Sequence, residues 1–201
     1  LASGRVQYFP MCEYEGDGKF RSKLTGKEHA VSYKKLVDAT FLTIAVPSTH
    51  TPNFTIAPEV TFMPLNELPK VTQKPEGYVV IGGGKTGIDA CLWLLDSDVD
   101  PEDITWIRSR EAWLLDRANT QPTEAFFDKS VGSIAAQYEA IGGASSIANM
   151  FDRLEEGGYL LRLDQTLRPT MFHAATISKS EIAQLQRIKS IVRMGQVSAI
   201  E

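Results

Sequence analysis

The chain has 201 residues, of which 43% are hydrophobic and 23% are charged, and its formal net charge is −4. This balance is typical of a globular protein with a buried core, and it excludes an intrinsically disordered chain. Lysine and arginine are scattered without forming a basic stripe, so nucleic acid is not an expected partner. We expect a small-molecule substrate instead, and the composition leaves a homo-oligomer open.

The cysteine and histidine residues do not predict a cross-link or a metal site. Cys12 and Cys91 are far apart, in segments that we interpret as a strand and a helix, and they match neither a disulfide framework nor a zinc pattern. His29, His50 and His173 lack metal-ligand spacing to any cysteine or carboxylate cluster. No apolar run reaches the roughly eighteen residues that span a bilayer. We therefore expect a cytoplasmic protein with no metal and no membrane partner.

The first 70 residues are predicted to form a β-meander and a connector. Strand-like runs at residues 6–9, 20–24, 30–33 and 38–46 are separated by turn signals, among them Gly16-Asp17-Gly18. Residues 47–69 contain prolines at positions 47, 52, 58, 64 and 69, each of which fixes φ and removes a backbone donor. This second segment is expected to run along a surface without regular elements.

A strand–helix–strand unit follows the connector. Residues 78–81 and 104–107 are short apolar runs of the kind that buried parallel strands need. Residues 85–96 between them have one apolar helical face, which consists of Ile88, Cys91, Leu92 and Leu95. Such a unit predicts a parallel pair of strands with a right-handed crossover. The predicted fold class is therefore α/β, with a Rossmann-like parallel sheet.

The remainder of the chain is predicted to alternate between helices and short strands. Helical patterns cover residues 123–140, 145–155 and 180–189. A strand is expected at residues 159–163, and residues 191–200 resemble two short strands that turn at Gly195.

The residues that point to chemistry join the first apolar strand to its helix, in the run Gly82-Gly83-Gly84-Lys85-Thr86-Gly87. The three glycines at positions 82, 84 and 87 match the dinucleotide fingerprint. In that pattern the first glycine makes a tight turn, the second admits a pyrophosphate close to the backbone, and the third lets the helix approach the strand. The helix N-terminus would direct its amide groups at the phosphates. The alternative is a glycine turn with a purely structural role.

Gly84-Lys85-Thr86 also resembles the end of a Walker A loop. That motif requires a glycine five residues before Gly84, where the sequence has Val79 within the strand, so the spacing disfavours an NTPase. Lys85 then either supports the charge of a phosphate or is a solvated residue of the first helical turn.

Two arginines follow the second strand of the unit and bear on which nicotinamide cofactor is bound. An acidic residue at this position would favour NAD, because it accepts a hydrogen bond from the ribose 2′-hydroxyl. The sequence has Arg108 and Arg110 instead, which would project to one side of an extended chain and meet a 2′-phosphate. NADP is the predicted cofactor. The alternative is a pair of surface arginines that form ion pairs with Glu111 or Asp116.

The order of meander, proline-rich connector and glycine fingerprint resembles the flavin-dependent NAD(P)H oxidoreductases, the superfamily of flavin-containing monooxygenases and pyridine-nucleotide-disulfide oxidoreductases. The resemblance rests on residues 80–90, on Trp106-Ile107-Arg108 and on residues 112–115. It also includes residues 37–47, where Val46 stands in place of the family's glycine. In that family the nicotinamide domain is inserted within the FAD domain.

The resemblance implies hydride transfer from NADPH to FAD, with monooxygenase-like chemistry because a Cys-x-x-Cys pair is missing. It assigns residues 1–70 to part of the FAD domain as a β-meander remnant with its connector, residues 71–158 to the NAD(P)-binding domain, and residues 159–201 to a return segment. Because the chain begins with Leu1 and has one glycine fingerprint, we expect a fragment that binds NADPH weakly, without flavin or turnover. FAD would belong to the intact parent protein. A non-catalytic NADP-binding or redox-sensing module is the alternative function.

Overall fold

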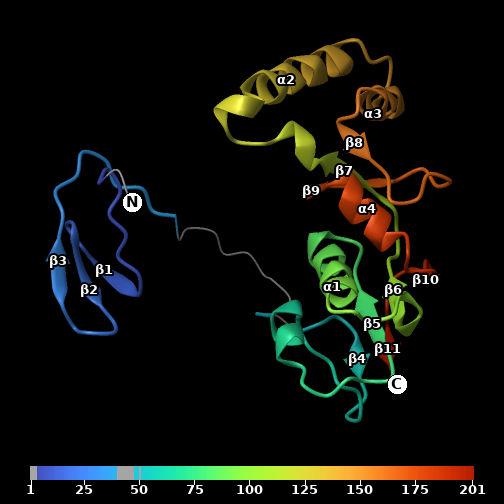
Figure 1. The fold of residues 1–201 in the computed structure, drawn as a ribbon, viewed down its shortest axis with the longest axis horizontal. Coiled ribbons are helices and arrows are strands. Elements are labelled where there is room, and N and C mark those ends of the chain that lie inside the picture. Colours follow the sequence, from blue (N-terminus) through green and yellow to red (C-terminus); the bar gives the residue numbers. More distant parts are fainter. Residues whose placement is uncertain (1–3, 40–47, 50) are drawn as a thin grey trace. The chain divides into compact units, whose positions relative to one another are not determined.

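A computed structural model describes residues 4–39, 48–49 and 51–201 and divides the chain into two compact units, Leu1–Ala45 and Val46–Glu201 (Figure 1). Residues 40–46 of the strand predicted at 38–46, and His50, lie outside the described residues. The second unit contains every helix described below.

The first unit is a three-stranded antiparallel meander. Its strands are β1 (Cys12–Gly16), β2 (Lys19–Ser22) and β3 (Glu28–Ala30), in the order β1-β2-β3. The turn predicted at residues 16–18 joins β1 to β2, and Gly18 adopts a φ of 76° there. A Cβ atom at Gly18 would lie 2.3 Å from the Val31 carbonyl oxygen, so there is also no room for a side chain at this position. The strand predicted at residues 6–9 is wrong, because pairing begins only at Cys12.

The second unit contains a wholly parallel sheet that is formed by β5 (Tyr78–Ile81), β6 (Ile104–Ile107) and β10 (Ser190–Val192), in the order β10-β6-β5. Helix α1 (Lys85–Asp96) connects β5 to β6, and a short 3-10 helix, Pro101–Asp103, precedes β6. The bounds of β5, α1 and β6 agree with the sequence prediction, which confirms the strand–helix–strand unit.

Helix α1 packs on the parallel sheet through one apolar face. Its residues Ile88, Cys91, Leu94 and Leu95 are at most 5% exposed, as are Ile104 and Trp106 of β6. Leu92, which was predicted to lie on this face, is only partly buried. The same core includes residues of α4 (Lys179–Leu185), which packs against α1 and begins with a capping box between Ser178 and Glu181.

A second core in this unit lies around a mixed sheet. Strand β7 (Ala112–Asp116) pairs parallel with β9 (Met171–Ile177) and antiparallel with β8 (Leu160–Leu161). Helices α2 (Phe127–Gly142) and α3 (Ile147–Glu156) contribute to its core, which contains Trp113, Ala140, Leu154 and Leu160. Figure 1 shows α2 and α3 on the far side of β7 from α1.

The remaining elements are short. Strand β11 (Ala199–Ile200) pairs parallel with β4 (Thr55–Ile56), and 3-10 helices cover Leu65–Lys70, Arg117–Asn119 and Glu124–Phe126. The two strands predicted within residues 191–200 are therefore present, but β10 and β11 belong to different sheets. No helix among the described residues is long and apolar enough to cross a membrane.

The structure thus shows a mixed α/β protein with several small sheets, some of them parallel. Residues 159–201 supply β9 and β10, which pair with strands from residues 71–158 within the same compact unit. The assignment of residues 1–70 and 159–201 to a flavin domain stays a prediction.

The packing of α1 predicts that the two thiols differ in reactivity. Cys91 is fully buried, and burial raises its pKa to about 12, so the reactive thiolate is scarce at neutral pH. Cys12 is half-buried in β1. We expect iodoacetamide to label Cys12 in the native protein and to leave Cys91 unlabelled, as measured by mass spectrometry of peptides. Both should react in concentrated guanidinium chloride, and equal labelling of the two in the native state would contradict this packing.

Candidate site at the glycine turn

The turn that joins β5 to α1 begins with a hydrogen bond to the neighbouring strand. The Gly82 N–H donates to the Ile107 carbonyl at 2.8 Å, and Gly82 has a φ of 121°, which side chains rarely adopt. Gly84 is the extended residue just before the helix, and its carbonyl accepts from the Ile88 N–H at 3.0 Å. The chain therefore leaves the sheet and enters the helix within three residues.

The glycines of this turn differ in what surrounds them. A Cβ atom at Gly87 would lie 2.0 Å from the Gly82 carbonyl oxygen, so only hydrogen fits where α1 crosses the turn. A Cβ atom at Gly83 would lie 3.1 Å from the Cβ of Arg108. A Cβ atom at Gly84, in contrast, would meet nothing within 4 Å, and Gly84 is exposed. The turn is thus packed against the protein at Gly83 and Gly87, and it has open space at Gly84.

The open side of the turn is the N-terminus of α1. The N-cap residue is Gly84, which has no side chain to cap the helix, so its own capping leaves the first amide groups available to an anion. Thr86 is exposed beside them. Lys85 pairs with Asp89 one turn further along the helix, which partly neutralises the charge that was predicted to support a phosphate.

The structure places Arg108 inside the protein rather than at its surface. Its side chain is 6% exposed, its Nη1 lies 3.1 Å from Glu111 Oε2, and its guanidinium carbon lies 4.6 Å from the centre of the Trp106 ring. Burial lowers the pKa of Arg108, while the Glu111 carboxylate acts in the opposite direction. Its Nε has no hydrogen-bond partner within the described part of the chain. The pairing with Glu111 that the sequence left as an alternative is therefore present for Arg108.

Arg110, by contrast, is exposed at the same edge of the sheet. The prediction that both arginines project to one side required the chain to stay extended, but β6 ends at Ile107. The Arg110 carbonyl lies 3.5 Å from the Cβ position of Gly83, so this segment still borders the glycine turn. The structure brings the glycines and the arginine segment together and separates the two arginine side chains.

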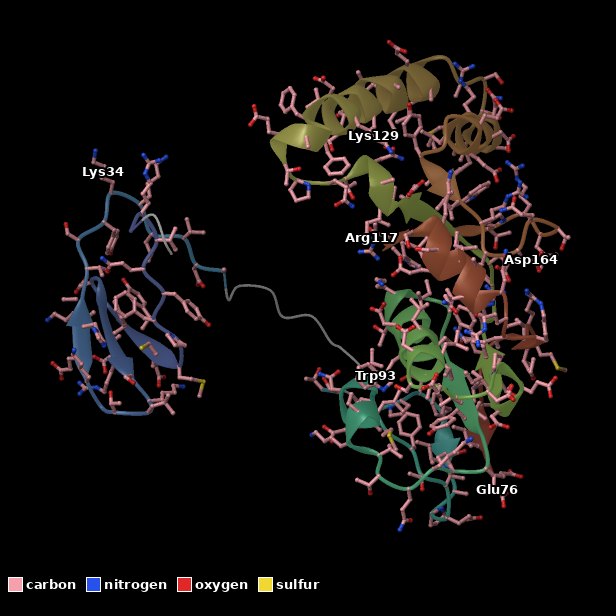
Figure 2. The ribbon with its side chains drawn as sticks, viewed as in Figure 1. Lys34, Glu76, Trp93, Arg117, Lys129 and Asp164 are labelled. Carbon is pink, nitrogen blue, oxygen red and sulfur yellow. The ribbon has the colours of Figure 1, made fainter. Side chains whose placement is uncertain are left out.

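Glu111 belongs to a network of alternating charges that the sequence did not predict. Its other oxygen accepts from Arg193 Nε at 2.7 Å, and Arg193 Nη2 lies 3.1 Å from Asp164 Oδ2. Asp164, labelled in Figure 2, follows β8, whereas Arg193 follows β10. Hydrogen bonds from Thr166 hold the pKa of Asp164 below its usual value. The only signal for this network in the sequence is that Arg193 directly follows an apolar run. Its contacts, Glu111 and Asp164, lie in distant parts of the sequence, so the network could not be predicted.

Two cavities lie away from this site. One of about 310 Å³ is lined by Tyr78, Trp93 and Asp98 among others, near the C-terminal end of α1, where Figure 2 labels Trp93. The other, of about 250 Å³, lies between β7, α3 and the start of β9, with Trp113 and Phe172 in its wall. The glycine turn is therefore a surface site rather than part of either cavity.

The chain is similar to three mycobacterial proteins. One is an uncharacterized protein of Mycobacterium bovis, and two are uncharacterized proteins of Mycobacterium tuberculosis strains. Each is 50% identical to this chain over 202 residues, a match that covers 100% of the chain and 37% of the relative. The chain thus spans a little over a third of the length of these relatives. No family model matches the chain, and no solved structure matches it significantly.

The close approach at Gly87 predicts a large stability difference between two glycine substitutions. Gly87→Ala would press a methyl group into the Gly82 carbonyl and should lower the free energy of unfolding by about 1–3 kcal/mol. The matched control is Gly132→Ala in α2, where a Cβ atom has open space and alanine favours the helix by roughly 0.5–1 kcal/mol. Urea unfolding measures both values. Equal effects of the two substitutions would show that α1 does not contact the turn.

Proposed function

We propose that the glycine turn binds the pyrophosphate of a nicotinamide dinucleotide. The observation that carries this proposal is the contrast between Gly87, where only hydrogen fits against Gly82, and Gly84, which is exposed with open space around it at the helix N-terminus. These are the two different reasons for which the fingerprint requires glycine. A turn with a purely structural role explains the glycine at position 87 but gives no reason for the one at position 84.

The arrangement of the strands supports the same proposal. In a mononucleotide-binding half of a Rossmann-like sheet, the parallel strands lie in the order 3-2-1 and the ligand binds at their carboxyl ends. The order β10-β6-β5 corresponds to this half, and the glycine turn follows the carboxyl end of β5. The Rossmann-like assignment of the sheet is part of the proposal.

We propose further that the cofactor is NADP and that Arg110 provides the contact to its 2′-phosphate. Arg110 is exposed beside the turn, whereas Arg108 is buried against Glu111 and Trp106. An arginine at the surface keeps its five donors available for a phosphate without breaking a buried ion pair. Of the two predicted contacts, the one from Arg110 is therefore the better supported.

The larger function proposed is that of an FAD-dependent oxidoreductase with monooxygenase-like chemistry, of which this chain is the nicotinamide-binding portion. It rests on the resemblance of residues 80–90 and 106–108 to flavin-dependent NAD(P)H oxidoreductases. In such proteins the flavin and the nicotinamide supply the redox chemistry, while the protein binds and orients them. FAD would be bound by the intact parent protein, and the substrate would be a small molecule.

Substitution of Gly84 tests the proposed binding site. Gly84→Val should abolish binding of NADPH while the protein stays folded, because the side chain would occupy the open space but would meet no atom of the protein. Gly132→Val, at an equally open position in α2, is the control and should bind NADPH like the unmodified chain. Isothermal calorimetry measures binding, and circular dichroism measures folding. Unchanged affinity in Gly84→Val would remove the dinucleotide proposal.

Substitution of Arg110 tests the choice of cofactor. The unmodified chain should bind NADPH at least about tenfold more tightly than NADH, and Arg110→Ala should reduce this ratio towards one by weakening NADPH alone. Arg187→Ala removes the same charge from an exposed site before β10, at the opposite end of the sheet, and should leave the ratio unchanged. Equal affinities of the unmodified chain for the two nucleotides would contradict the assignment to NADP.

A further inference from the structure

A chain of contacts leads from the buried ion pair of Arg108 and Glu111 to the backbone of the glycine turn. Glu111 holds the Arg108 guanidinium, and this group lies over the Trp106 ring at 4.6 Å. The indole Nε1 of Trp106 donates a hydrogen bond of 2.8 Å to the Gly82 carbonyl. Trp106 itself is 1% exposed, so its ring is buried, and the Arg108 guanidinium covers it. Each group in this series is held by the one before it.

The hydrogen bond from Trp106 determines how the first peptide of the turn is oriented. The peptide bond between Gly82 and Gly83 is trans, so its N–H points away from its carbonyl. Because the Gly82 carbonyl points towards Trp106 and towards α1, the Gly83 N–H is directed away from both. Loss of the indole donor would free this peptide to rotate, because Gly82 and Gly83 impose little resistance of their own.

We propose that Arg108 is a positioning residue for the glycine turn and does not contact the bound nucleotide. It holds the Trp106 indole in the orientation that fixes the Gly82 carbonyl, and it thereby keeps the turn in the shape that receives a pyrophosphate. This inference rests on the proposed dinucleotide site. The guanidinium keeps its place over the ring even though its Nε lacks a partner within the described residues, so ring contact and the Glu111 ion pair account for its position.

If Arg108 positions the turn, substitutions of Arg108 and of Arg110 should change the affinities for NADPH and NADH differently. A residue that shapes the pyrophosphate site acts on NADPH and NADH equally, because both have the same pyrophosphate. A residue that meets the 2′-phosphate acts on NADPH alone. Arg110 is therefore the matched comparison for Arg108, since it has the same side chain two residues away.

The test combines calorimetry with ¹H–¹⁵N spectra of the full chain. Arg108→Met keeps an unbranched side chain about as far as the position of Nε and removes the charged guanidinium. It should lower the affinities for NADPH and for NADH by the same factor, roughly two- to tenfold, which is the loss expected for one hydrogen bond. It should also shift the Trp106 indole resonance and the Gly82 to Gly84 amide resonances in the free protein. Arg110→Ala should leave those resonances in place and should lower the affinity for NADPH only.

Two further variants keep the test decisive if Arg108→Met destabilises the fold by leaving Glu111 without one of its partners. Trp106→Phe retains an aromatic ring but has no N–H donor, and it should weaken both nucleotides equally. Arg108→Met combined with Glu111→Gln also removes the buried carboxylate charge that has lost one partner, and it should behave like Arg108→Met. Loss of NADPH affinity alone in either Arg108 variant, or unchanged indole and turn resonances, would overturn the proposal.

The result also separates this inference from the function on which it rests. If the unmodified chain binds neither nucleotide, the proposed function fails. The resonances of Trp106 and of the turn in the free variants still decide whether Arg108 positions Gly82, since they are measured without any ligand.

Discussion

The contact between Gly87 and the Gly82 carbonyl is the constraint on which the candidate site depends. A Cβ atom at Gly87 would lie 2.0 Å from that oxygen, so the first turn of α1 rests directly on the backbone that leaves β5. This close approach directs the helix N-terminus to the carboxyl end of the parallel sheet. It also leaves Gly84 as the exposed point at which an anion can reach the helix amides. Any side chain at position 87 would move α1 and therefore the site.

A second layer of organisation comes from charges at the same edge of the sheet, of which Arg108 and Glu111 are buried. Arg108, Glu111, Arg193 and Asp164 alternate in sign, and they join the segments that follow β6, β10 and β8. Removing Arg108 or Glu111 would leave its partner's charge in a poorly solvated place, which is destabilising. The network therefore holds together strands that are distant in sequence. It also explains why an arginine that follows a nucleotide-binding pattern is directed inwards.

Local signals in the sequence were sufficient for the centre of the fold. The apolar runs and the spacing of Ile88, Cys91 and Leu95 predicted β5, α1 and β6 with the bounds that the structure has, because these elements form between neighbours in the chain. The glycine spacing predicted the close helix contact at Gly87 for the same reason. Thr86 and Lys85 were also placed correctly in the first turn of the helix, although Lys85 pairs with Asp89.

Features that depend on distant parts of the chain were not predictable in this way. Strand β10 pairs with β6 across more than 80 residues, as Ser190 pairs with Thr105, and no local pattern indicates that partner. The strand pair β7 and β9 was missed because β7 follows β6 closely and was not recognised as a separate strand. Arg108 was predicted to be exposed beside Arg110, with an ion pair to Glu111 as the alternative. The contact of Arg193 with the same Glu111 carboxylate was not predictable, because it is set by the tertiary fold.

The central claim is that an anion of a dinucleotide binds at the N-terminus of α1, and titration of the ¹⁵N-labelled chain with NADPH tests it most directly. The backbone amides of Gly83, Lys85, Thr86 and Gly87 should shift in a saturable manner, and inorganic pyrophosphate should shift the same set. Amides in α2, which contributes Ala140 to the second core, should stay unchanged. If NADPH leaves the resonances of the glycine turn in place, the dinucleotide site is not there.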